Sequence, residues 1–153
     1  MPQPLWDYAV ATYARAGVAA ACLALQDEQG ADVNLVLYAL WLADQGQALE
    51  LEQVAAVDAV IDEWRREVVM PLRELRRRWR ALPSAAEFRT SLHELELQAE
   101  RHQLETMVQN LDPGACQAGI DPGTNLAVLG QYWGLEEAVW SDLKAALGVA
   151  DRG

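Results

Sequence analysis

The feature that most constrains the fold is a seven-residue repeat of apolar side chains in the middle of the chain. The repeat comprises Val54, Ile61, Val68, Leu75 and Leu82, with Val57 and Trp64 at the alternate position. Such spacing is typical of a long helix that packs along one seam. Pro71 interrupts the repeat, and proline both removes a backbone hydrogen bond and clashes with the preceding turn. Because the seam continues beyond Pro71, it predicts one helix that is kinked between Val68 and Pro71 and ends at Pro83.

The rest of the chain also shows helical spacing, and no stretch alternates apolar and polar residues long enough to indicate a strand. Ser84 with Glu87 forms a capping box, which predicts that the next helix opens there and runs to about Asn110. Two Asp-Pro-Gly triplets predict an internal loop over 112–124. A C-terminal helical hairpin is expected over 125–148. The sequence therefore predicts an all-α fold, a single domain over 1–153 built as a bundle of six or seven helices with a long central helical hairpin.

Charge and composition limit the expected partners and cellular location of the protein. The formal net charge is −11, which disfavours non-specific binding to nucleic acid or to an anionic membrane. No secretory signal is visible at the N-terminus, and the longest apolar run, 35–43, is shorter than the roughly 20 residues of a membrane span. Cys22 and Cys116 lie in no metal or redox spacing and are interpreted as free thiols. We expect a cytoplasmic protein that does not enter a membrane.

A row of arginines is the most conspicuous candidate for a binding surface. Between Trp64 and Arg80 there are seven arginines and two glutamates, although the chain as a whole is acidic. Four of them share one helix face at spacings of three and four: Arg73, Arg76, Arg77 and Arg80. Because the chain is so acidic, we expect the row to pair mainly with this chain's own carboxylates on the following antiparallel helix, namely Glu94, Glu96, Glu100 and Glu105. The alternative is a docking surface for a partner, since guanidinium groups on a rigid helix suit carboxylates or phosphates.

The helix expected over 84–110 carries two apolar stripes on nearly opposite sides. One stripe comprises Phe88, Leu92, Leu95 and Ala99, and the other comprises Leu97, Leu104, Val108 and Leu111. A surface helix normally has one stripe, so this helix is expected to make contacts on two sides. The second stripe is either covered by other helices of the same chain or forms the interface of a symmetric homodimer.

Sites for small molecules are weakly marked. Asp32 is expected to cap the helix that follows it, with Asn34 supporting the first turn. The alternative is a polar recess for a ligand, formed by Asp32 and Asn34 near Trp41 at a helix N-terminus. His93, Glu96 and Glu100 share a helix face, but no second helix offers matching ligands, so we expect no metal site. The sequence indicates no catalytic residues and no cofactor.

One segment resembles a known family. The residues from Cys22 to Gly46, CLALQDEQGADVNLVLYALWLADQG, are the most distinctive, together with Leu5-Trp6-Asp7 and Tyr13-Ala14-Arg15. They resemble a family of small proteobacterial proteins, found in pseudomonads among others, that is known only as conserved and hypothetical. The similarity extends from the N-terminus to about residue 110. This resemblance implies a bacterial, cytoplasmic protein and provides no catalytic residues.

The leading hypothesis is a non-enzymatic protein that binds or regulates another protein, because catalytic constellations are absent and the arginine row is segregated. The first alternative is a nucleic-acid-associated protein that uses the arginine-rich helix 65–80. The second is a small-ligand binder or an enzyme with a site near Asp32 and Trp41.

Overall fold

The computed structural model describes residues 3–110 and 120–149, and within these ranges every regular element is helical. The elements are α1 (Leu5–Tyr13), α2 (Val18–Gln29), α3 (Val33–Asp44), α4 (Leu51–Trp64), η1 (Arg65–Val69), α5 (Met70–Arg80), η2 (Pro83–Phe88), α6 (Arg89–Gln109), α7 (Pro122–Trp133), η3 (Glu137–Trp140) and α8 (Ser141–Leu147). Because α4, η1 and α5 form one continuous helix, the described residues contain seven helices and no strand. The predicted all-α fold is confirmed.

The continuous helix passes Pro71 through one wide turn. Met70 donates its N–H to the carbonyl of Arg65, five residues back, instead of the four of an ordinary α-helix. This π-turn, η1, directly precedes the proline and provides the space that the pyrrolidine ring would otherwise take from the preceding turn. The predicted continuity of the helix through Pro71 is therefore confirmed.

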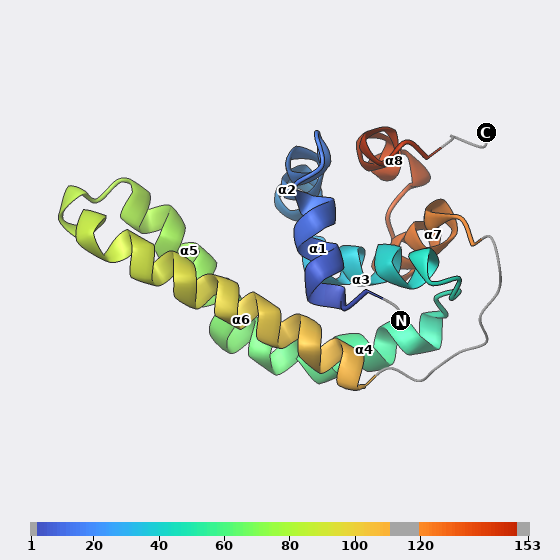
Figure 1. Ribbon diagram of the computed structural model, residues 1–153, viewed down its shortest axis with the longest axis horizontal. Helices are drawn as coiled ribbons and strands as arrows, with labels where there is room; N and C mark the ends of the chain where they lie inside the picture. Colours follow the sequence, from blue (N-terminus) through green and yellow to red (C-terminus); the bar gives the residue numbers. More distant parts are fainter. Residues whose placement is uncertain (1–2, 111–119, 150–153) are drawn as a thin grey trace.

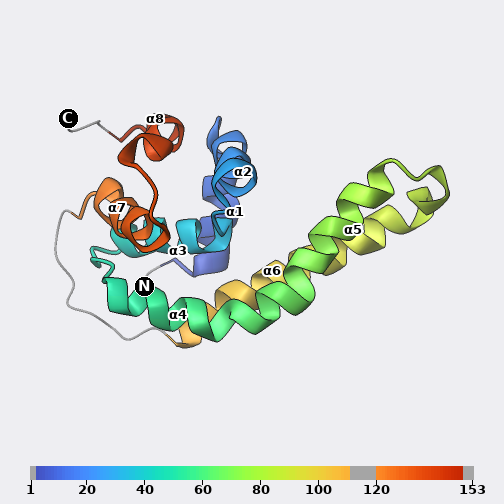
Figure 2. The same ribbon diagram turned by 180° about the vertical axis from the view of Figure 1, so that it is seen from behind.

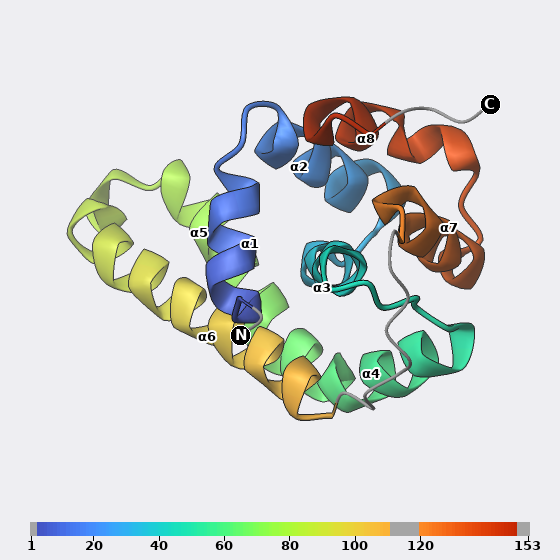
Figure 3. The ribbon, with the colours of Figure 1, turned by 45° about the vertical axis from the view of Figure 1, so that its right-hand side comes forward.

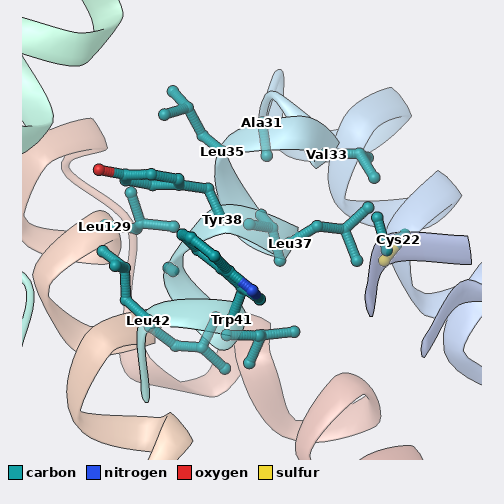
Figure 4. Close-up of a cluster of buried hydrophobic side chains, with 14 of the residues drawn as sticks. Cys22, Ala31, Val33, Leu35, Leu37, Tyr38, Trp41, Leu42 and Leu129 are labelled. Carbon is teal, nitrogen blue, oxygen red and sulfur yellow. The ribbon is translucent and has the colours of Figure 1, made fainter. Parts of the chain in front are cut away.

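Helix α3 forms the centre of the bundle. It contacts α1, α2, α6 and α7 (Figure 3), and its side chains are buried on all sides from Val33 to Ala43. A helix that is apolar all round needs such cover. Figure 4 shows the resulting cluster, in which Cys22 of α2 and Leu129 of α7 lie at opposite ends.

Asn125 of α7 attaches the C-terminal helices to this core. Its amide N–H groups donate to the carbonyls of Ala39 and Gln47, at 2.9 and 3.0 Å, and its oxygen accepts from the N–H of Leu49 at 2.9 Å. The second Asp-Pro-Gly triplet was expected to be part of a loop over 112–124, but it begins a helix. Asp121 accepts from the N–H of Gly123 at 2.8 Å, so α7 starts at Pro122 rather than at 125. Residues 112–119 of the expected loop lie outside the described residues.

The long hairpin of α5 and α6 projects away from the other helices (Figures 1 and 2). None of the residues of α5 is buried, because α5 packs mainly on α6 and the turn η2. The predicted capping box at Ser84 and Glu87 is wrong, because Pro83–Phe88 is a 3-10 turn without a side-chain cap and α6 begins at Arg89.

The two predicted stripes of α6 are also wrong as a description of its buried face. The buried residues follow a single line that includes two polar side chains: Leu92, Glu96, Ala99, Gln103, Leu104 and Met107. Phe88, Leu95 and Leu97 are exposed instead. The pattern was misleading because the stripes include only apolar residues, whereas Glu96 and Gln103 are buried through hydrogen bonds with Arg76 and Asp32 from other parts of the chain.

Candidate functional site

Asp32 is the centre of a buried polar network. One carboxylate oxygen caps α3 by accepting from the N–H of Asn34 at 2.9 Å, as predicted. The other oxygen accepts from Arg65 Nη1 at 3.1 Å and from Gln103 Nε2 at 2.9 Å. The residue is 8% exposed, so these bonds take the place of water around the charge. Asp32 therefore joins α3, α4–α5 and α6 at one point.

Arg65 extends this network to two further carboxylates. It donates to Asp58 at 2.6 Å and to Asp62 at 2.8 Å, and the hydroxyl of Tyr132 donates to the second oxygen of Asp58 at 2.8 Å. Burial lowers the pKa of the Arg65 guanidinium, but its hydrogen bonds to Asp58 and Asp32 outweigh burial and raise the pKa. Arg65 stays charged and holds these helices together. Sequence reasoning missed this role of Arg65, although Asp58 and Asp62 stand two turns and one turn before it.

The arginine row is largely paired within the chain. Arg73 bonds to Glu100 at 3.0 Å, and Arg76 bonds to Glu96 at 2.7 Å, which confirms the predicted pairing across the hairpin. Arg77 pairs instead with Asp27 of α2 at 3.1 Å. Arg80 makes no ion pair with any residue in 3–110 or 120–149. The row therefore does not form one free surface, and its unpaired member lies toward the end of the hairpin.

The far end of the hairpin exposes large apolar side chains. Phe88 is 59% exposed, and Leu82 between the two helices is also exposed. Arg78 and Arg80 lie exposed in the last turn of α5 beside this segment. Leu95, which is 50% exposed, lies about two turns further along α6 toward the other helices. We refer to these five residues as the arm tip.

A pocket of about 340 Å³ lies between α1, α2, α3 and the base of the hairpin. Its apolar lining includes Trp6, Val10, Tyr13, Leu23, Leu37 and Leu97, and its polar lining includes Asn34, Arg73, Arg76, His93, Glu96 and Glu100. Asn34 and Glu96 are 5% and 3% exposed. Burial raises the pKa of the Glu96 carboxyl, while Arg76 opposes this shift. We refer to this site as the apolar pocket.

The predicted recess of Asp32, Asn34 and Trp41 is not one site. Asn34 lines the apolar pocket, whereas Asp32 lines a separate, more polar cleft of about 690 Å³ with Arg65 and Arg77. Trp41 lines neither, because its indole N–H donates to the carbonyl of Gln3 at 2.7 Å on another side of α3. The recess prediction is wrong because Asp32 and Asn34 project on opposite sides of the first turn.

The predicted dimer-interface residues have different positions. Leu104 is 2% exposed within the single chain, so it is not available to a second copy. Val108 is partly buried and packs against the same core. Leu97 is exposed at the apolar pocket, and Leu111 lies outside the described residues.

The described residues offer little metal-binding or nucleophilic chemistry outside these sites. They contain no group of three or more His, Cys, Asp or Glu side chains that could hold a metal ion. Burial raises the pKa of the Cys22 thiol to about 11, which makes it a poor nucleophile; Cys116 lies outside the described residues. No single described helix is long and apolar enough to cross a membrane, and α1 with α2 reaches that length only as a pair bent by 99°.

The comparisons with known proteins agree with the resemblance found in the N-terminal segment. No curated protein and no solved structure matches the chain. Residues 4–107, which span α1 to most of α6, match a family described as DUF2390, protein of unknown function. The chain therefore belongs to this family, which has no assigned function.

Proposed function

We propose that the chain is a non-enzymatic interaction protein of the bacterial cytoplasm that binds another protein through its arm tip. The observation that carries this proposal is the hairpin of α5 and α6, which projects away from the remaining helices (Figure 1). Leu82 and Phe88 near its end are exposed, and so is Leu95 further along α6. Soluble proteins seldom leave several large apolar side chains exposed together unless a partner covers them.

Charge indicates the chemistry of the partner. From Leu72 to Leu95 there are six arginines and three glutamates, although the whole chain carries −11. Aromatic and arginine side chains are the residue types that contribute most to protein interfaces. The arm tip therefore fits a partner with an apolar groove and an acidic rim.

Site-specific crosslinking followed by binding measurements tests the proposal. A photoreactive benzoyl-phenylalanine in place of Phe88 should crosslink one defined protein in the native cell, and the same group in place of Leu51 should not. Leu51 is the matched control because it is also an exposed apolar residue, at the start of α4 on the body.

With the crosslinked protein in hand, Phe88→Asp and Leu95→Asp should each weaken its binding at least about tenfold, since burial of such side chains is worth about 1.5–3 kcal/mol. Their melting temperatures should stay at the wild-type value because both side chains are exposed. Equal binding of these variants and of Leu51→Asp would refute the arm tip as the contact.

Nucleic acid is the second candidate because Arg78 and Arg80 remain exposed. Three arginines of the row are already neutralised by Asp27, Glu96 and Glu100. Few phosphate contacts are therefore available, and affinity for a DNA duplex should be weak with a shallow salt dependence. A steep fall of affinity between about 50 and 200 mM salt would favour nucleic acid over a protein partner.

A further inference from the structure

The apolar pocket collects polar atoms that have no partner. Among the described residues, five buried side-chain polar atoms make no hydrogen bond, and three of them belong to residues that line this pocket. These three atoms are Asn34 Nδ2, Arg76 Nε and Glu96 Oε2. Buried polar groups in folded proteins nearly always have a partner, and a group left without one destabilises the fold. A molecule held in the pocket would supply the missing partners.

The charged groups around the pocket already balance one another. Arg76 is paired with Glu96, and Arg73 is paired with Glu100. A charged ligand would have to separate one of these pairs or remain unpaired in a mostly apolar site. The pocket therefore favours a neutral ligand.

The two buried side chains define the polar end of that ligand. Asn34 Nδ2 is a donor without an acceptor, and the second oxygen of the Glu96 carboxylate, which is paired with Arg76, is an acceptor without a donor. Glu96 keeps this oxygen free because its other oxygen is held by Arg76 at 2.7 Å. A head group that offers both a carbonyl oxygen and an N–H has the chemistry to pair with both atoms.

The walls define the rest of the ligand. Trp6 and Tyr13 of α1 contribute aromatic surface, and Val10, Leu23 and Leu97 contribute exposed aliphatic side chains from three different helices. A volume of about 340 Å³ is at the small end of the range for ligand sites. An apolar body of one ring or two short chains would cover these side chains, which otherwise face water.

We propose that the apolar pocket binds a small, neutral, largely apolar molecule through an amide-like head that accepts from Asn34 and donates to Glu96. This site is separate from the arm tip. It assigns a ligand function to the base of the hairpin, in addition to the protein contact proposed for its end.

A matched set of four probes tests the ligand chemistry. The probes are 3-phenylpropanamide, 3-phenylpropanoate, 3-phenylpropylammonium and propylbenzene, which share the apolar body and differ in the head. In titrations followed by two-dimensional amide NMR, the amide should bind at least tenfold more tightly than each of the other three. The amide signals whose chemical shifts change on binding should belong mainly to α1, α3 and α6. Equal affinity for all four probes, or no saturable binding of the amide, would overturn the proposal.

Two variants test the residues. Glu96→Gln keeps an oxygen for Arg76 but places an NH₂ group where the free acceptor was, so it should weaken binding of the amide at least tenfold. Asn34→Leu removes the donor and should also weaken binding of the amide at least tenfold. Because it replaces an unpartnered amide by an apolar group of similar volume, Asn34→Leu should melt no lower than wild type.

Glu94→Gln is the matched control, since Glu94 is an exposed glutamate on the same helix, and Phe88→Asp separates this site from the arm tip. Both should bind the amide with wild-type affinity. If Glu96→Gln and Glu94→Gln bind alike, the probe occupies another site and the proposal fails. Failure of the arm-tip crosslink would leave these outcomes unchanged.

Discussion

Replacement of Asp32 by alanine should be one of the more damaging single changes outside the apolar core. The change removes the cap of α3, worth about 1 kcal/mol. It leaves Gln103 with neither end of its amide bonded, which costs about 1–2 kcal/mol because Gln103 is 1% exposed. Arg65 keeps Asp58 and Asp62, so the loss of its third carboxylate adds only about 1 kcal/mol. The free energy of unfolding should fall by about 3 kcal/mol.

For a chain of 153 residues this loss corresponds to a fall in Tm of about 6–12 °C. Thermal and urea unfolding followed by far-UV circular dichroism measure it. Asp27→Ala is the matched control because the Asp27–Arg77 pair is exposed on both sides, and such pairs contribute about 0–1 kcal/mol. A loss in Asp32→Ala no larger than in Asp27→Ala would refute the reasoning.

Asp32→Asn distinguishes the cap from the network. Asparagine caps helices as well as aspartate does, so a residue that acted only as a cap would tolerate the change. In this structure the new NH₂ group would face two donors, Arg65 and Gln103. Asp32→Asn should therefore lose nearly as much stability as Asp32→Ala. Wild-type stability in Asp32→Asn would mean that Arg65 and Gln103 contribute nothing through this carboxylate.

Three further predictions concern buried side chains. Leu104→Glu should give an unfolded chain by far-UV circular dichroism, because it places an unpaired charge in the core; a folded monomer would instead indicate a dimer contact. In a Cys116→Ser variant, Cys22 should react with a thiol reagent only as the chain unfolds, since burial raises its pKa to about 11; prompt reaction of the native protein would contradict this. The raised pKa of Glu96 favours its protonated form in the folded state, so its contribution to stability is greatest at low pH and falls as pH rises through the raised pKa. The free energy of unfolding of Glu96→Gln, relative to that of wild type, should therefore increase between about pH 4 and about pH 7. A difference between the two proteins that does not change with pH would refute this reasoning.

Local signals in the sequence predicted where α2 ends and α3 begins, but they misplaced the starts of α6 and α7. Gly30 adopts the left-handed conformation, with φ of 69°, and Asp32 caps the next helix, as glycine and aspartate at these positions indicate. The helix through Pro71 was predicted because its seam continues on both sides. Each of these features depends on a few neighbouring residues, which the sequence shows directly.

The candidate sites depend on contacts between distant segments, and these were predicted only in part. The pairing of Arg73 and Arg76 with carboxylates of α6 followed from the antiparallel hairpin. The partners Gln103 and Asp27 did not, because they come from helices whose relative positions the sequence does not reveal. The pairing of Glu96 with the arginine row was predicted, but its burial was not, because burial depends on how the other helices pack around it.

The two candidate sites lie at opposite ends of one hairpin, and the family match includes both. Every residue that lines the apolar pocket, from Trp6 to Leu104, lies within residues 4–107, and so does the whole arm tip. Helices α7 and α8 lie outside that match and contribute Asn125 and the apolar cover of α3. Variants of α7 should therefore act on stability, whereas variants of Glu96 or Phe88 should act on binding. The segment shared with the family contains the groups on which both proposals depend, and the C-terminal helices support them by keeping α3 buried.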